Sequence, residues 1–137
     1  MKTTKKVSEE AKPEFDFRTI KSFEDACVKE NEDPSKLPDV SMISEVRGKD
    51  LIARYKLEVI YSAINDGWMP IKNGKLQPRY EVYHYLLPSG SGFDFSGSHY
   101  RYTYANANAG LRLCTETKEQ SDYIKDQFAD LMKDMLL

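Results

Sequence analysis

The sequence lacks the features by which several classes of protein are recognised. No apolar run approaches the ~18 residues that a membrane-spanning helix needs, and the N-terminal MKTTKKVSEEAKPEF contains no apolar stretch that would form the core of a signal peptide. The two cysteines, Cys27 and Cys114, lie far apart and show no CxxC or Cys/His ligand spacing. That excludes a disulfide framework and gives no metal-site signal. We therefore expect a cytoplasmic protein that uses no cofactor and no metal.

An excess of charge of one sign is also lacking. The chain has 20 Lys and Arg against 22 Asp and Glu, a net charge of −2, so no overall basic field draws in nucleic acid or an anionic membrane. A length of 137 residues with 40% hydrophobic content suits a single core. Residues 1–14 mix Lys and Glu without an apolar period, and we expect a mobile tail there, followed by one domain over residues 15–137.

Three segments have helical patterns. SFEDACVKEN begins at Ser22, a residue suited to an N-cap, with Asp25 at the capping-box position, and it ends in the proline-containing linker NEDPSKLPD. A broader apolar stripe predicts a helix over Asp50–Asp66, followed by a left-handed cap at Gly67. The last pattern predicts one helix over the C-terminal residues 118–137, opened by a capping box at Thr117 and Gln120.

The segment between the second and third helices has strand patterns. Short aromatic runs, YEVYHYLL, GFDFS, HYRYTYA and LRLCT, are separated by clusters of Gly, Pro, Ser and Asn. The sequence therefore predicts an α+β fold in the order α-α-β-β-β-α. We expect the helices to pack on one face of a three- to four-stranded antiparallel meander; a partly closed barrel is the alternative.

Tyrosines are concentrated in these predicted strands. Alternation places aromatic side chains on both faces of the sheet, while helices are expected to cover only one face. A tyrosine surface left exposed can anchor a protein partner, and we predict such a contact through Tyr83, Tyr85, Tyr100 and Tyr102, with Arg101 beside them. The plainer explanation is that tyrosines favour strands and pair across them for stability alone.

A weak, sequence-tolerant binder of single-stranded nucleic acid is an alternative function. Residues 68–118 carry 6 basic and 3 acidic side chains, a local charge of +3. Tyr80, Tyr83, Tyr100 or Tyr102 would stack on bases. The cations available to contact phosphates are Lys72, Lys75, Arg79, Arg101 and Arg112.

A small enzyme is the third alternative, resting on His84 and His99. Either histidine, set beside Glu81 or Asp94, would form a minimal acid–base pair, but no residue spacing indicates one. The glycine-rich GSGFDFSG is neither a dinucleotide-binding fingerprint nor a phosphate-binding loop. Both cysteines are expected to be buried, inert thiols.

The order of several segments resembles a known family. TIKSFEDAC, LPDVS, ARYKLEVIYSAINDGWMP, SGFDFS, GLRLC and DQFADLMKDMLL follow one another over residues 19–137. This arrangement is similar to small uncharacterised proteins of Bacteroides-type gut bacteria and their phages, including crAss-like phages. The resemblance implies an accessory protein of a phage or mobile element, and it carries no activity with it. The lack of catalytic or metal spacing, the negative net charge and the excess of aromatic residues over what one buried sheet face can absorb lead us to expect a small non-catalytic binding protein of such an element.

Overall fold

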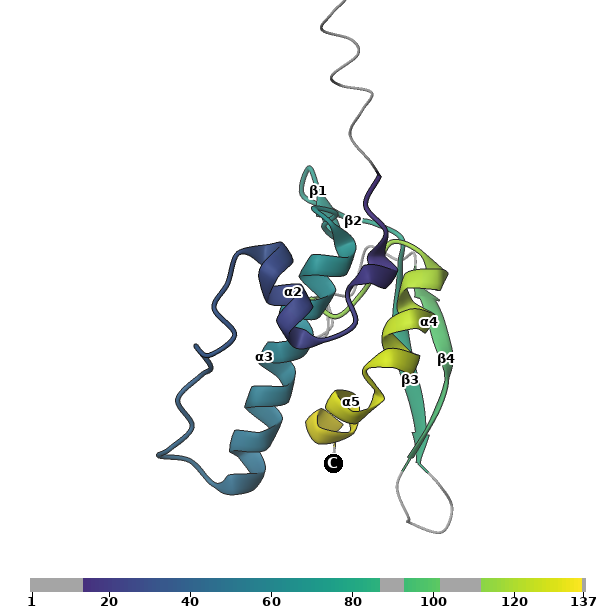
Figure 1. Ribbon diagram of the computed structural model, residues 1–137. Coiled ribbons are helices and arrows are strands. Elements are labelled where there is room, and N and C mark those ends of the chain that lie inside the picture. The colour runs from purple at the N-terminus through teal and green to yellow at the C-terminus, as the bar shows by residue number, and fades with distance from the viewer. Residues whose placement is uncertain (1–13, 87–92, 102–111, 137) are drawn as a thin grey trace, which may run out of the picture.

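Helices precede and follow the strands in the computed structural model (Figure 1). The structure describes residues 14–86, 93–101 and 112–136, with side chains over 14–82 and 112–135. The α+β class is confirmed, whereas most of the predicted tail lies outside the described residues. The elements are η1 (Phe17–Thr19), α2 (Phe23–Glu30), α3 (Glu45–Asn65), β1 (Ile71–Lys72), β2 (Lys75–Leu76), β3 (Arg79–Leu86), β4 (Phe93–Arg101), α4 (Lys118–Gln127) and α5 (Ala129–Leu136).

The strands form two separate antiparallel pairs, β1 with β2 and β3 with β4, so the predicted three- to four-stranded meander is not confirmed. Two of the predicted strands, GFDFS and HYRYTYA, meet in β4. The predicted strand LRLCT contributes a single bridge, between Thr115 and Tyr80. The ladder stops there because Thr117, two residues later, is already the N-cap of α4.

The register of the β3–β4 hairpin contains one irregularity. Tyr83 lies opposite Gly97, whereas the next residue, His84, lies opposite Phe95, so Ser96 is the extra residue of a bulge on β4. A bulge increases the local twist of a strand pair.

Helix α3 is the centre of the helical part, with α2 and α5 packed against it and α4 packed on β3 and β4 (Figure 1). Its buried face supplies much of the core: Ala53, Leu57, Val59, Ile60, Tyr61, Ala63 and Ile64. We expected the helices to pack on one face of the sheet, but among the described helices α4 is the one that packs extensively on β3 and β4, whereas α2 and α5 pack on α3. The single predicted helix is divided at Phe128, whose backbone (φ −118°, ψ 33°) leaves helical geometry while its ring is buried in the core.

Both ends of α3 differ from the prediction. The helix begins at Glu45, after an N-cap at Ser44 whose side chain accepts from Arg47 N at 3.3 Å. The apolar stripe missed this start because the first turn is exposed, with Val46 71% accessible. At the other end the left-handed cap is Asp66 (φ 48°, ψ 52°), and Gly67 follows with φ 91°.

The predicted caps at the starts of α2 and α4 are confirmed. Ser22 accepts from Asp25 N at 3.1 Å. Asp25 itself does not close a capping box, because its carboxylate accepts from Lys21 N at 3.0 Å. Thr117 and Gln120 form the complete capping box.

Gln120 also joins α4 to α3. Its Oε1 accepts from Thr117 N at 3.1 Å, while its Nε2 donates to Ile64 O, in the last turn of α3, at 3.2 Å. At the next residue of α3, Asn65 Nδ2 donates to Cys114 O at 2.9 Å. These contacts tie the end of α3 to the segment leading into α4, and the Gln120 contact supplies a donor to a carbonyl in the last turn of α3.

We expect Gln120→Ala to lower the free energy of unfolding by roughly 1–2 kcal/mol, because it removes half of the capping box and the bond to Ile64. Gln120→Glu keeps an acceptor for the box and loses only the donor, so its loss should be about half as large. Urea unfolding followed by circular dichroism measures both. No loss in Gln120→Glu would contradict a role for the bond to Ile64, and equal losses for the two variants would contradict a role for the capping box.

The loop before α3 approaches the helix closely at Gly48. A Cβ atom at this position would lie 3.1 Å from Val40 Cβ. Gly→Ala inside a helix ordinarily stabilises by about 1 kcal/mol. Here we expect no gain from Gly48→Ala, because Val40 must move, but a gain of about 1 kcal/mol from the same change in a Val40→Gly background, since only glycine at position 40 removes the contacting Cβ. Urea unfolding of the two single variants and the double variant measures the gain from Gly48→Ala with and without Val40. The same gain in both backgrounds would contradict the contact between positions 40 and 48.

Candidate binding cleft

The residues predicted to contact a partner lie on the β3–β4 hairpin. Tyr83 and Tyr85 are in β3, and Tyr100 and Arg101 are in β4, whereas Tyr102 lies outside the described residues. For the four in the strands the structure gives the backbone register: Tyr83 opposite Gly97, Tyr85 opposite Asp94, Tyr100 opposite Tyr80 and Arg101 opposite Arg79. The predicted tyrosines of the two strands are therefore not direct cross-strand partners.

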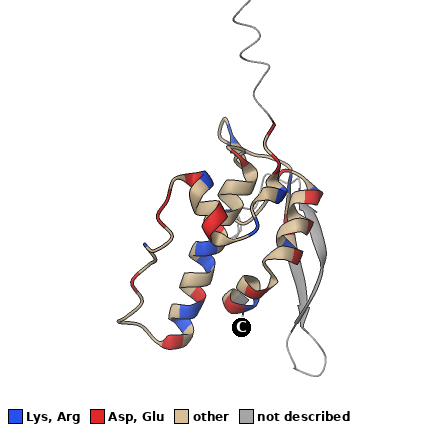
Figure 2. Cartoon of the chain, in the orientation of Figure 1, with Lys and Arg blue, Asp and Glu red and all other residues tan. Residues whose placement is uncertain are grey.

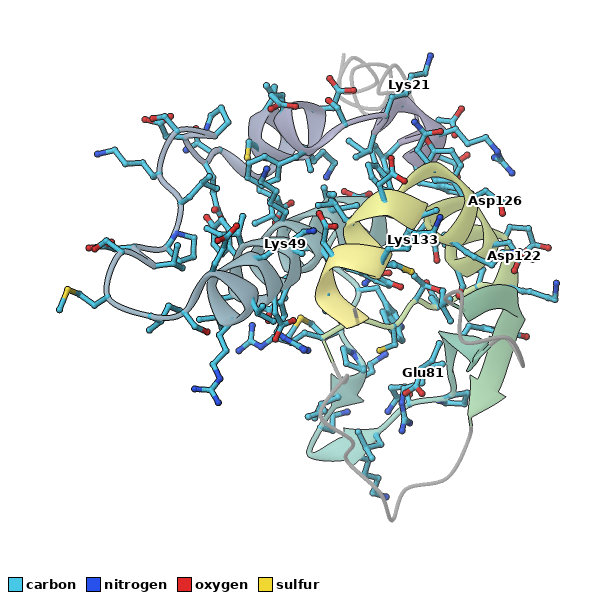
Figure 3. All side chains as sticks on the ribbon, turned by 90° about the horizontal axis from the view of Figure 1, so that it is seen from below. Lys21, Lys49, Glu81, Asp122, Asp126 and Lys133 are labelled. Carbon is cyan, nitrogen blue, oxygen red and sulfur yellow. The ribbon has the colours of Figure 1, made fainter. Side chains whose placement is uncertain are left out.

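The two histidines are on the same hairpin. His84 lies opposite Phe95, and His99 lies opposite Glu81, one of the two carboxylates considered as a partner. The Glu81 carboxylate accepts from Arg79 Nε at 3.4 Å. Figure 3 labels Glu81 on the strand side of the molecule, apart from Lys49 and Lys133 on the helices. An acid–base pair of a histidine with a carboxylate stays a prediction.

Arg79 is a buried residue that the sequence analysis assigned to the surface. Its side chain is 0% exposed; besides the contact with Glu81, its Nη1 donates to Gln77 O at 3.4 Å. Arg79 is therefore unavailable to phosphates, which corrects one of the five predicted contacts. Arg79 and Glu81 are at i and i+2 of one strand, so they share a face. This spacing of opposite charges is the sequence feature that could have indicated the ion pair.

Near this ion pair lie two further buried ionisable groups, Tyr61 and Cys114. Burial, with smaller contributions from Cys114 and Glu81, raises the pKa of the Tyr61 hydroxyl. Burial and then the charge of Glu81 raise the pKa of the Cys114 thiol to about 12, opposed by Arg79. Cys114 is therefore protonated at neutral pH and is no nucleophile, as expected for an inert thiol.

Cys114 also lines a cleft of about 240 Å³ at the C-terminal end of α3. The sequence analysis did not predict this cleft, because its walls come from segments far apart in the chain. One wall is a stripe on α3, another is the turn that follows α3, and the third is the segment before α4. The lining residues are Glu58, Ser62, Asn65, Trp68, Met69, Pro70, Ile71, Arg112 and Cys114.

A second, wider groove of about 510 Å³ lies between the loop before α3, the N-terminal half of α3 and α5. Lys49 Nζ on α3 and Asp134 Oδ1 on α5, 3.4 Å apart, both line it. Basic residues recur along this half of α3 (Figure 2). Close by, the turn before the helix exposes Met42, which is 92% accessible, and Ile43. The charges that line the groove are of both signs, so it does not select an anion or a cation.

Comparison with known proteins assigns no family. No family model matches the chain, and neither does any curated protein or solved structure. No helix among the described residues is both long and apolar enough to cross a membrane. Within the same part of the chain, no group of three or more His, Cys, Asp or Glu residues is arranged to hold a metal ion.

The raised pKa of Cys114 predicts a loss of stability at alkaline pH. The thiol ionises in the unfolded chain near its ordinary value of 9.0 and in the folded chain near 12. Its stabilising contribution is therefore complete below pH 9 and is lost as the pH rises toward 12. Between pH 8 and pH 10, we expect the free energy of unfolding to fall by about 1 kcal/mol more than in Cys114→Ala. Urea unfolding at the two pH values tests this, and equal falls would contradict the assignment.

Proposed function

We propose that this chain is a small non-catalytic binding protein that contacts a protein partner through the β3–β4 hairpin. Its origin in a phage or mobile element, and its action in the cytoplasm of the host cell, rest on the family resemblance and remain part of the proposal. The observation that carries the proposed contact is the coverage of the hairpin. α4 packs on β3 and β4, and no other described helix packs against them to a comparable extent (Figure 1).

The edges of the hairpin also support a protein contact. β3 has one bridge outside the pair, to Thr115, and among the described residues no third strand is paired with β4. A strand edge of this kind presents backbone donors and acceptors to another chain, which is how extended peptides add to a sheet. The tyrosines of the same two strands would then supply side-chain contacts of large, rigid area.

Nucleic acid is the less favoured partner. Arg79, one of the five cations predicted to contact phosphates, is buried beside Glu81. Lys72 and Lys75 are exposed, but they belong to the small β1–β2 pair and not to the hairpin that carries the stacking tyrosines. Two of the five predicted phosphate contacts would therefore lie on a different sheet from the stacking tyrosines, and with Arg79 buried, Arg101 is the remaining predicted cation on the strands of the hairpin.

The test is affinity capture with the tagged chain from cells that express it. We expect the unaltered protein to retain a partner. The amount of partner captured should fall at least tenfold when Tyr83, Tyr85, Tyr100 and Tyr102 are all replaced by alanine. The matched control is the double variant Met42→Ala, Val46→Ala, which changes two exposed apolar residues near the start of α3. This variant should capture the partner as well as the unaltered protein does. Circular dichroism of each variant shows that it is folded.

Two results would overturn this proposal. One is capture that is unchanged in the four-alanine variant, and the other is the absence of any enriched partner. A labelled thymidine oligomer provides the competing assay by fluorescence anisotropy. Binding at low salt that weakens in Arg101→Ala would replace the protein partner with single-stranded nucleic acid.

A further inference from the structure

We propose that the cleft at the C-terminal end of α3 binds a small zwitterion with an apolar side chain, of the class of the apolar α-amino acids. This site is separate from the β3–β4 hairpin, so its failure would leave the proposed function untouched. The inference rests on two features of the cleft: two opposite charges that have no ion-pair partner among the described residues, and an apolar wall.

The α3 wall offers acceptors. Glu58, Ser62 and Asn65 follow one another at i, i+4 and i+7, so they form one stripe along the helix. The Ser62 hydroxyl is already committed as a donor to Glu30 Oε1. Asn65 donates its Nδ2 to Cys114 O, while its Oδ1 is buried and has no hydrogen-bond partner. The Glu58 carboxylate therefore suits a ligand that brings N–H donors, such as an ammonium group.

Arg112 brings the opposite charge to the same cleft. It is exposed, and across the described parts of the chain neither Arg112 nor Glu58 forms an ion pair or a side-chain hydrogen bond. A guanidinium forms paired, charge-assisted hydrogen bonds with a carboxylate. A simple anion would be repelled by Glu58 and a simple cation by Arg112, so a ligand that carries both charges fits best.

The remaining wall is apolar and sets the size of the ligand. Trp68, Met69, Pro70 and Ile71 line it, and Met69 (66%) and Ile71 (47%) remain largely accessible. A volume of about 240 Å³ is below the range of roughly 300–1,000 Å³ that is typical of sites for drug-sized ligands. The cleft thus has room for one apolar side chain with its charged groups, and a nucleotide is too large.

Trp68 makes the test direct, because it is the single tryptophan of the chain and it lines the cleft. L-phenylalanine and L-leucine, titrated into the full chain, should change the Trp68 fluorescence with saturation. Two matched probes each lack one charge: L-phenylalaninamide has no carboxylate, and N-acetyl-L-phenylalanine has no ammonium group. We expect each probe to bind at least tenfold more weakly than L-phenylalanine.

Variants assign the charges to residues. Arg112→Gln should remove the preference for L-phenylalanine over L-phenylalaninamide, and Glu58→Gln should remove the preference for L-phenylalanine over N-acetyl-L-phenylalanine. The control is Lys72→Gln, at an exposed position that does not line the cleft, and it should change neither preference. The proposal would be overturned if the fluorescence shows no saturable change up to about 10 mM ligand, because a weaker affinity than this is too low for a useful site. Equal binding of all three phenylalanine compounds would also overturn it. Isothermal titration calorimetry provides the second readout if the fluorescence of Trp68 responds to solvent changes alone.

Discussion

The end of α3 is held by two side-chain amides, and the rest of the structure depends on this junction. Gln120 Nε2 donates to Ile64 O, and Asn65 Nδ2 donates to Cys114 O. Without Gln120, the Ile64 carbonyl in the last turn of a largely buried helix would lose its side-chain donor, at a cost comparable to a lost hydrogen bond. Because Gln120 also closes the capping box of α4, the same residue fixes where α3 ends and where α4 begins. The bridge between Thr115 and Tyr80 then attaches β3 to this point.

The junction explains why buried polar chemistry and the cleft occur together. The segment from Arg112 to Thr115 passes between the end of α3 and the start of β3, and it brings Cys114 close to Tyr61, Arg79 and Glu81. Burial is the main cause of the raised pKa values of Tyr61 and Cys114, and the charge of Glu81 adds to both. Cys114 also lines the cleft, where Glu58 and Arg112 are not paired with each other. One crossing segment therefore contributes both to the buried polar groups and to the wall of the cleft.

The parts of the fold that were predicted correctly depend on residues close together in the sequence. Ser22 and the Thr117–Gln120 box mark helix starts because an N-cap and the amide that it satisfies are only two or three residues apart. The body of α3 was predicted because its buried residues recur at the helical period. Its first turn was missed because Val46 is exposed, so that no apolar stripe marked the start. The division of the C-terminal helix at Phe128 was missed because the apolar period continues through it.

The sequence by itself determined the α+β class, most helix positions, the caps and the inert character of Cys114, since each of these follows from local spacing or from an absence. Only the tertiary structure decided that the strands pair two by two, that Arg79 is buried against Glu81, and that α5 packs on α3 while α4 packs on the hairpin. The cleft belongs to the second group, because Glu58, Trp68 and Arg112 come from three segments that only folding brings together. Local preferences act over one or two helical turns, whereas burial and the pairing of charges depend on contacts between distant residues, which no pattern in one sequence specifies.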